Sequence, residues 1–376
     1  MKPIQMVDLQ SQYLKIKSEI DSGIFEVIES CSFVKGQKVK DFQQNLAKYL
    51  DVKHVIAVGN GTDALQIALM SLDLKAGDEV ITPTFTFIAT AEVVALLGLK
   101  PVLVDVDFDT FCIDIQALEK AITPKTKAIV PVHLFGQNAN MEAILELAKK
   151  HNLFVIEDAC QSMGSQYIFE NGEKKHSGCM GTIGCTSFFP SKNLGCYGDG
   201  GAIFTNDDNL AEKITMIANH GMKTRYYHDI VGVNSRLDTI QAAILDAKLK
   251  HLDNYIASRQ KAAEFYNNAF KDCKKVITPK IAPFTTHSFH QYTLKLVDVD
   301  RENLIKKLNE KNIPAMVYYP VPLHLQKAYK SENGKENNFP IAENLAKTVI
   351  SLPMHTELDN EQLEYITENF LLMLKD

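Results

Sequence analysis

Over its first two thirds, the chain alternates short runs of aliphatic and β-branched residues with stretches of helical periodicity. We expect strands at seven places: 55–58, 79–82, 100–104, 128–132, 153–157, 185–189 and 202–205. Three of the connecting segments, 64–72, 89–97 and 141–151, have the apolar spacing of amphipathic helices. Short apolar strands joined by helical crossovers predict an α/β fold, with a large, mostly parallel sheet covered on both faces. Ligands of such sheets bind beyond the carboxyl ends of the strands.

The last third of the chain has a different organisation. A long helical stretch, 235–270, is expected to lead from the sheet into a smaller α+β unit. Its predicted strands are 291–297 and 314–318, its predicted helices are 301–311, 341–349 and 360–374, and the polar segment 331–338 is expected to be a surface loop. We therefore divide the 376 residues into a large α/β domain, 1–250, and a small C-terminal α+β domain, 251–376.

One lysine stands where a solvated surface charge is not expected. Lys192 lies between an apolar, strand-like run and the glycine-rich segment 195–201. Asp158 closes an earlier apolar run, 153–156, with Glu157 between them. Taken singly, a lysine is usually solvated, and a strand-end aspartate often caps a helix or binds Mg²⁺. Together they suggest pyridoxal 5'-phosphate (PLP), with Lys192 forming a Schiff base and Asp158 pairing with the ring nitrogen.

A phosphate-binding turn is the third element of this pattern. The run 54–58 meets the sequence Gly-Asn-Gly-Thr at 59–62, and a helical stretch follows. Backbone N–H groups at such a helix start, with the Thr62 hydroxyl, form a cradle for a phosphate group. The alternative is an ordinary helix start, capped by Thr62 or Asp63.

Six segments, taken in order, resemble the DegT/DnrJ/EryC1/StrS family of sugar aminotransferases. They are GNGTDAL at 59–65, TPTFTF at 82–87, EDACQ at 157–161, TSFFPSK at 186–192, GDGG at 198–201 and GVNSRLD at 232–238. The resemblance covers nearly the whole chain and implies the aspartate-aminotransferase fold, that is, PLP fold type I. Segments 60–67, 188–192 and 351–355 are most similar to the enzymes that aminate C3 of UDP-2-acetamido-2-deoxy-3-oxo-glucuronate.

The resemblance also assigns cofactor contacts. It implies that Gln161 lies beside the phenolic oxygen of PLP and that Ser187 binds the phosphate together with Gly61 and Thr62. Phe87 aligns with the aromatic residue that stacks on the ring, although Phe85, two residues earlier in the same extended run, is an alternative.

Further contacts are implied for a second subunit and for the substrate. Asn234 is expected to bind the phosphate of the neighbouring subunit, so that a homodimer shares its active sites. Arg236 is either a surface residue or a bidentate guanidinium ligand of the sugar's C6 carboxylate, reaching across the same interface. Tyr318 and His324 are expected to close the substrate site from the small domain. His133 either contacts substrate or satisfies a buried hydrogen bond, and His220 is left unassigned.

Composition excludes several other classes of protein. The formal net charge is −6 and no basic stripe occurs, which argues against a nucleic-acid partner. No uncharged apolar stretch approaches the ~18 residues of a membrane span, and the start of the chain has no apolar secretion signal. The seven cysteines show no metal-ligand spacing, so no metal is expected, and their scattered placement fits reduced thiols in the cytoplasm.

The expected function is transfer of the amino group of glutamate to the C3 keto group of a UDP-linked 2-acetamido-3-oxo-glucuronate, for cell-surface polysaccharide such as lipopolysaccharide O-antigen. A dTDP-3-oxo-6-deoxyhexose or a UDP-4-keto sugar is the alternative acceptor. A PLP sugar dehydratase of the same fold is less favoured, because those relatives replace the lysine by histidine and Lys192 is present here. A PLP-binding regulator is the third alternative.

Overall fold

A seven-stranded sheet dominates the computed structural model, which describes residues 2–329 and 337–375. The strand order is β1-β9-β8-β5-β4-β2-β3. The strands comprise β1 (His54–Val58), β2 (Glu79–Pro83), β3 (Lys100–Val104), β4 (Thr126–Ile129), β5 (Phe154–Asp158), β8 (Ile183–Ser187) and β9 (Gly201–Thr205). Only β9 runs against the others, since it pairs antiparallel with both β1 and β8 while the remaining pairs are parallel. The carboxyl ends of the other six strands therefore meet at one edge.

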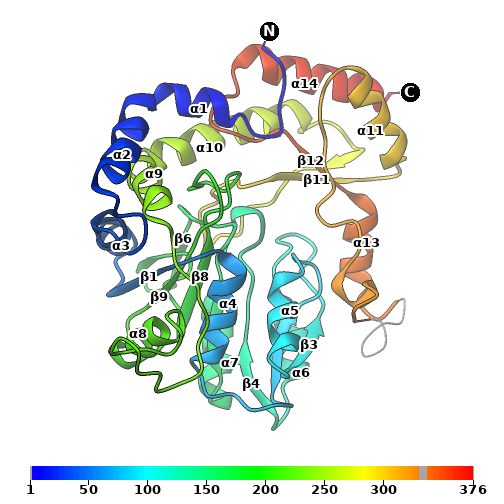
Figure 1. The fold of residues 1–376 in the computed structure, drawn as a ribbon. Helices are drawn as coiled ribbons and strands as arrows, with labels where there is room; N and C mark the ends of the chain where they lie inside the picture. Colours follow the sequence, from blue (N-terminus) through cyan, green and yellow to red (C-terminus); the bar gives the residue numbers. More distant parts are fainter. Residues whose placement is uncertain (1, 330–336, 376) are drawn as a thin grey trace.

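Helices cover both faces of this sheet (Figure 1). The apolar faces of α4 (Gly61–Met70), α5 (Ala89–Leu96) and α8 (Asp208–Ile217) form one core with the strands. The other face carries α3 (Gln37–Leu50), α6 (Ile115–Ala121), α7 (Met141–His151) and α9 (Thr239–Leu249). Alternating residues of β5 show the division, because Ile156 belongs to the first core and Val155 to the second. The predicted α/β sheet covered on both faces is confirmed.

The C-terminal part forms a smaller unit around a three-stranded antiparallel sheet. Its strands, in spatial order, are β10 (Val276–Ile277), β11 (Tyr292–Leu296) and β12 (Val349–Leu352). Its helices are α10 (Leu252–Phe270), α11 (Arg301–Glu310), α13 (Pro340–Thr348) and α14 (Asn360–Met373). The chain's N-terminal segment lies against this unit, since Met354 N–H donates to the Met6 carbonyl, and α1 (Leu9–Lys15) and α2 (Lys17–Ser30) follow (Figure 1). A short hairpin, β6 (Gln166–Ile168) and β7 (Lys174–His176), completes the strands.

Three sequence predictions differ from the structure. The helix expected over 235–270 is two helices, α9 and α10, separated at Lys250 and His251. The strand expected at 314–318 is a single bridge between Met316 and Ser351. Strand β11 pairs instead with β12, a strand that the helical pattern of 341–349 did not predict. Most of the loop expected at 331–338 lies outside the described residues. The domain boundary at residue 250 coincides with the break between α9 and α10, and the division remains a proposal.

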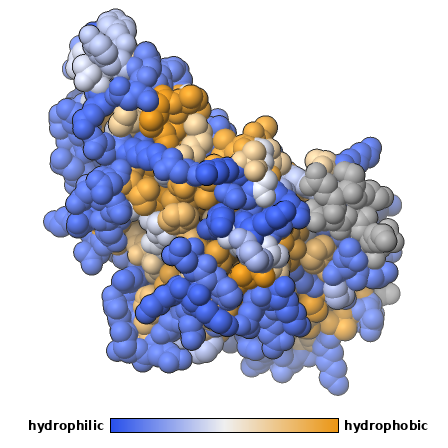
Figure 2. Space-filling view, turned by 90° about the horizontal axis from the view of Figure 1, so that it is seen from below, coloured by the Kyte–Doolittle hydropathy of each residue, from blue (hydrophilic) through white to orange (hydrophobic). Residues whose placement is uncertain are grey.

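The surface of the molecule is mixed in character. Figure 2 shows hydrophobic side chains gathered in patches between hydrophilic areas on the face seen from below. In the part of the chain that the structure describes, every helix is too short or too polar to cross a membrane.

Candidate active site

A cavity of about 690 Å³ opens at the carboxyl ends of the strands. It is lined by residues that follow β1, β2, β5 and β8, together with residues from the small unit. All the sequence-predicted site residues except Asn234, Arg236 and His324 line it: Gly61, Thr62, Phe87, Asp158, Gln161, Ser187, Lys192 and Tyr318. Segments more than 250 residues apart in the chain thus contribute to one pocket.

Lys192 is held in a rigid turn after β8. Its backbone N–H donates to the Phe189 carbonyl at 2.8 Å. The next residue, Asn193, anchors the turn, because its side-chain amide donates to the carbonyls of Met163 and Ser288 at 3.1 and 3.2 Å. Desolvation lowers the pKa of Lys192, and Cys160 and Asp158 nearby partly oppose this. A lysine with a lowered pKa has more of its amine in the free-base form, which is the nucleophilic and proton-accepting form.

Asp158, at the end of β5, is almost fully buried. Its Oδ2 accepts a hydrogen bond from the Thr90 hydroxyl at 2.9 Å, and its Oδ1 accepts one from the Cys160 backbone N–H at 3.2 Å. Its own backbone is fixed between neighbours, since its N–H donates to the Pro131 carbonyl and its C=O accepts from His133 N–H. The carboxylate is therefore presented to the pocket in a single orientation.

Gln161 and the aromatic residues form another wall. The Gln161 Oε1 accepts from Phe135 N–H at 3.0 Å, and its amide donates to the Tyr319 hydroxyl at 2.9 Å. Phe87 is 55 % exposed and lines the cavity, whereas Phe85 is 1 % exposed and packs inside the protein. The structure therefore places Phe87, and not Phe85, where a flat ring could stack.

The phosphate-cradle residues meet at the start of α4. Asn60 caps this helix, because its Oδ1 accepts from Asp63 N–H at 2.8 Å, so neither Thr62 nor Asp63 is the cap. A methyl group on Gly61 would lie 2.7 Å from the Ser187 Cβ and 3.1 Å from the Cys160 Sγ. Glycine is thus required for β8 to approach the helix start. The N–H groups of Gly61 and Thr62, which precede the capped Asp63, have no acceptor within the helix and remain available to an anion.

The structure does not bring His324 into the cavity. The side chain is fully buried, with Nδ1 2.8 Å from the Thr84 hydroxyl and Nε2 3.2 Å from Glu343 Oε1. Because both ring nitrogens already have partners, His324 supports the loop that carries Tyr318, and its expected contact with substrate is corrected.

Asn234 and Arg236 also lie away from the cavity of their own chain. Asn234 is exposed, and Arg236 lines a separate hollow of about 300 Å³ together with Lys35 and Lys40. A single chain does not test the prediction that they act in a neighbouring subunit.

His133 satisfies a buried hydrogen bond, which was one of its two interpretations. Its Nε2 lies 2.8 Å from Glu157 Oε2, and its Nδ1 accepts from Ala139 N–H at 3.1 Å. His220 is exposed and has a left-handed backbone (φ 58°).

Sequence reasoning missed several residues that the structure places at the site. Thr90 holds Asp158, and Cys160, His290 and Gln291 line the cavity. Cys160 stands between Asp158 and Gln161, so its position in the motif was a usable signal. Nothing in the sequence singled out Thr90 or His290, because their proximity to the site arises only when distant segments fold together.

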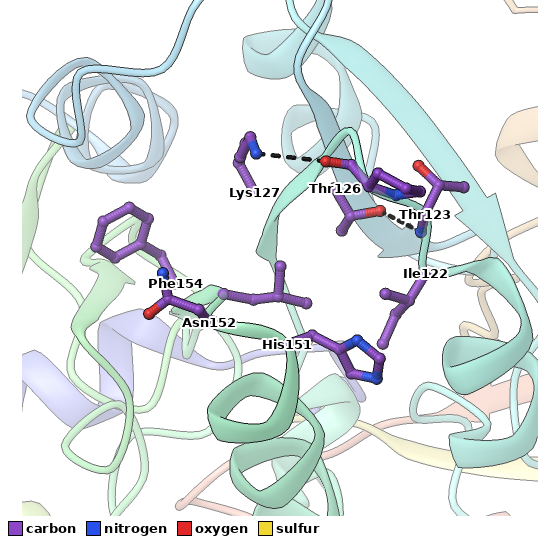
Figure 3. Close-up of a pocket in the computed structure, with 9 residues that line it drawn as sticks. Ile122, Thr123, Thr126, Lys127, His151, Asn152 and Phe154 are labelled. Atoms are coloured by element: carbon purple, nitrogen blue, oxygen red, sulfur yellow. Dashed lines mark hydrogen bonds between the residues drawn. The ribbon is translucent and has the colours of Figure 1, made fainter.

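A second hollow, of about 530 Å³, lies at the opposite edge of the sheet. Figure 3 shows its walls, which include Thr126 and Lys127 at the start of β4 and Phe154 at the start of β5. Phe154 and Asp158 mark the two ends of the same strand, roughly 13 Å apart at 3.3 Å per residue. This hollow is therefore separate from the chemistry at the carboxyl ends.

Comparison with known proteins agrees with this geometry. The DegT/DnrJ/EryC1/StrS aminotransferase family matches residues 14–371. The chain belongs to this family. The aminotransferase is 49 % identical to a "Pleiotropic regulatory protein" of Geobacillus stearothermophilus, over 97 % of both chains. It is 48 % identical to the UDP-2-acetamido-2-deoxy-3-oxo-D-glucuronate aminotransferase of Pseudomonas aeruginosa, over 96 % of this chain and 98 % of that one.

Solved structures extend the similarity to the whole fold. DesV of S. venezuelae, solved with a ketimine intermediate, superimposes with a TM-score of 0.95 at 37 % identity over 100 % of both chains. NtdA of Bacillus subtilis, solved with the cofactor PMP, superimposes with a TM-score of 0.88 at 32 % identity over 96 % of this chain and 82 % of that one. The aminotransferase thus has PLP fold type I, and PLP is its cofactor.

Proposed function

We propose that this aminotransferase moves the amino group of glutamate to the C3 keto group of a UDP-linked 2-acetamido-3-oxo-glucuronate. The observation that supports this chemistry is that Lys192 and Asp158 line the same cavity as the phosphate-cradle residues Gly61 and Ser187. The choice of sugar rests on the 48 % identity with the relative that bears this activity in its name.

The cavity fits PLP residue by residue. The open N–H groups of Gly61 and Thr62, with the Ser187 hydroxyl, suit the phosphate, and Phe87 suits the ring face. Asp158 suits the ring nitrogen and Gln161 the phenolic oxygen. When bound, PLP supplies an electron sink that lets a proton leave the carbon carrying the amino group.

The protein's own residues then have distinct tasks. Lys192, whose pKa is lowered by desolvation, accepts and returns the proton at the reacting carbon. Asp158, fixed by Thr90 and the Cys160 N–H, presents its carboxylate at one end of the cavity. Gln161, fixed between Phe135 and Tyr319, presents its amide in one orientation. These groups are pre-organised, so little reorganisation is needed during reaction.

We further propose that the enzyme is a homodimer with shared active sites, in which Asn234 binds the partner's phosphate and Arg236 binds the sugar's C6 carboxylate. Lys35 and Lys40 line the same hollow as Arg236. The proximity of Arg236 also contributes, after desolvation, to the lowered pKa of Lys35. Such a cluster of cations supports recognition of an anionic group.

The location of the reaction is also a proposal. The seven cysteines, all within the described residues, are free thiols, which supports a reducing compartment such as the cytoplasm. There the aminated sugar would serve as a precursor of cell-surface polysaccharide, such as lipopolysaccharide O-antigen.

A substrate panel tests the reaction. Purified enzyme is converted with glutamate to its pyridoxamine form and is then mixed with 3-keto or 4-keto nucleotide sugars, with and without a C6 carboxylate. We expect the fastest turnover with the UDP-linked 3-keto acid. A preference for a dTDP-linked 6-deoxy sugar or a UDP-4-keto sugar would replace this substrate and leave the transamination unchanged.

The shared site has its own test. Heterodimers of an Asn234→Ala subunit and a Lys192→Ala subunit should regain part of the activity, because one of their two sites then carries neither defect. If subunit exchange is demonstrated and activity does not return, Asn234 and Lys192 serve the same chain's site.

A regulatory role is the second candidate, because the Geobacillus relative is named a regulatory protein. Loss of the cofactor's visible colour on adding glutamate, without any sugar, distinguishes an active transaminase from a protein that only holds PLP.

A further inference from the structure

His290 lines the cavity beside Lys192 and has no role in the assignments above. It stands two residues before β11, where the small unit meets the large sheet. The side chain is 5 % exposed, so its immediate surroundings are almost free of bulk water.

The backbone around His290 is bound to both sides of the active site. The Ser288 carbonyl accepts from Asn193, the neighbour of Lys192, and the Ser288 N–H donates to the Gly136 carbonyl at 2.8 Å. Gln291 N–H donates to the Phe135 carbonyl at 3.2 Å. His290 is therefore held at a fixed place relative to Lys192 and Gln161.

On the small-unit side, the guanidinium of Arg259 holds the same segment. Its Nη1 donates to the carbonyls of Phe289 and His290, at 3.1 and 3.4 Å, and to that of Met354 at 3.0 Å. The backbone that carries the imidazole is thus held at the wall of the cavity.

The imidazole of His290 lacks a hydrogen-bond partner at Nδ1 within the described part of the chain. The Nδ1 of His176 also lacks a partner, but that ring does not line the cavity, and the Nδ1 atoms of His133, His287 and His324 all have partners. A buried polar group without a partner is costly, and native proteins retain few of them. Nδ1 is itself shielded from the cavity, whereas Nε2 is neither shielded nor hydrogen-bonded among the described residues, so Nε2 is the atom that a ligand in the cavity can reach.

The electrostatic environment restricts what that ligand can be. Burial, and then the positive charges of Lys192 and Arg259, lower the pKa of His290 well below its ordinary value. The ring is therefore neutral near pH 7, with one N–H donor and one bare nitrogen. A neutral imidazole is a weak base, so it is poorly suited to relay protons, and it carries no charge to attract a carboxylate.

We propose that His290 hydrogen-bonds a neutral polar group of the bound sugar, a ring hydroxyl or the acetamido group, on the Lys192 side of the cavity. His290 is thus a specificity-determining residue for the keto sugar. This inference rests on the proposed sugar aminotransferase function.

Two substitutions separate hydrogen bonding from packing. His290→Phe keeps a flat ring and removes both nitrogens, whereas His290→Asn keeps a donor and an acceptor. We expect His290→Phe to lower kcat/KM for the keto sugar about tenfold or more, mainly through KM, and His290→Asn to recover part of that loss. The glutamate half-reaction should slow by a clearly smaller factor than the reaction with the keto sugar in both variants, with no new ionisation in its pH profile.

Equilibrium binding gives a readout that does not depend on turnover. UDP-N-acetylglucosamine, titrated into the PLP-loaded enzyme by calorimetry, should bind more weakly to His290→Phe by a similar factor. If that variant does not fold, ¹⁵N-histidine-labelled wild type provides the same test, with His290→Asn identifying the signal. The imidazole nitrogens should shift when UDP-N-acetylglucosamine is added.

The inference is overturned if His290→Phe matches wild type with the sugar, if its glutamate half-reaction slows equally, or if the labelled nitrogens do not respond. In each case the wild type would still turn over the keto sugar. Failure of the proposed function is distinguishable, because the wild type itself would then not aminate the sugar.

Discussion

The hydroxyl of Thr90 should determine how firmly Asp158 is held. Thr90 lies in the first turn of α5 and is fully buried, and its Oγ1 donates to Asp158 Oδ2 at 2.9 Å. Thr90→Val replaces the hydroxyl with a methyl group of similar size. The change thus removes the hydrogen bond to Asp158, and with it the longer 3.4 Å contacts to the Thr86 hydroxyl and the Phe87 carbonyl, without opening a cavity. Thr90→Ser is its matched control because it keeps the hydroxyl.

The magnitude follows from the charge on Asp158. A hydrogen bond to a charged group contributes about 1.5–3 kcal/mol, roughly twice the value for a neutral pair. After Thr90→Val the carboxylate keeps the Cys160 N–H at 3.2 Å, but Oδ2 loses its 2.9 Å donor in a residue that is only 6 % exposed. We expect the PLP-loaded enzyme to lose about 1.5–3 kcal/mol of unfolding free energy. The glutamate half-reaction should slow about tenfold, because hydrogen-bond partners that orient a metal ligand typically contribute about ten- to a hundredfold and Thr90 orients Asp158 in a similar way.

Two assays measure these effects separately. Urea unfolding followed by circular dichroism gives the free energy of unfolding. Stopped-flow absorbance of the cofactor gives the half-reaction rate with glutamate alone, without any sugar. Thr90→Ser should remain close to wild type in the half-reaction, although it also loses a buried methyl group and so some stability.

Two results would refute the reasoning. If Thr90→Val reacts with glutamate as fast as wild type, the hydroxyl does not position Asp158. If Thr90→Ser is as slow as Thr90→Val, the methyl group's packing, and not the hydrogen bond, is what the site needs.

Three further predictions concern other parts of the molecule. Gly61→Ala should weaken PLP binding at least tenfold in a fluorescence titration, because its methyl group would lie 2.7 Å from the Ser187 Cβ; unchanged affinity would show that the cradle can widen. The free energy of unfolding should fall as pH falls from about 6.5 towards 4. Burial lowers the pKa of His287 to about 3, and burial with a nearby arginine lowers the pKa of His355 to about 4. The unfolded chain therefore binds more protons than the folded protein in this window. Urea midpoints at pH 7.5 and 4.5 check this, and His287→Asn should reduce the slope. Arg236→Ala should lower kcat/KM for the C6 acid by very roughly tenfold to a hundredfold more than for a matched 6-hydroxy sugar, and equal losses would assign Arg236 a structural or glutamate-binding role.

Much of the fold was readable because its signals are local. Apolar runs alternating with helical periodicity predicted the strands of the large sheet and three of its helices, and the structure agrees to within a few residues. The reversal of β9 was not readable, since an apolar run does not reveal its direction. The bridge at Met316 and the pairing of β12 with β11 were also missed, because strand pairing depends on which distant segments meet.

The candidate site divides in the same way. Residues inside contiguous motifs, such as Asp158 with Gln161 and Ser187 with Lys192, were predicted and lie in one cavity. His324 stood in a promising segment, yet its hydrogen bonds to Thr84 and Glu343 turn it into the protein interior. Whether a side chain faces a cavity or the core depends on packing, and a motif does not specify that.

The chemistry can thus be predicted from the sequence alone, because a reactive lysine, a strand-end carboxylate and a glycine turn must each be encoded where they act. The tertiary structure decided which groups surround them. Thr90 is 68 residues from Asp158, and His290 comes from the other unit of the chain. These contacts exist only because six strands direct their carboxyl ends to one edge and the small unit closes over it. Hydrogen bonds and desolvation act over a few ångströms of space, whatever the separation along the chain, so only the folded protein shows which residues tune the site.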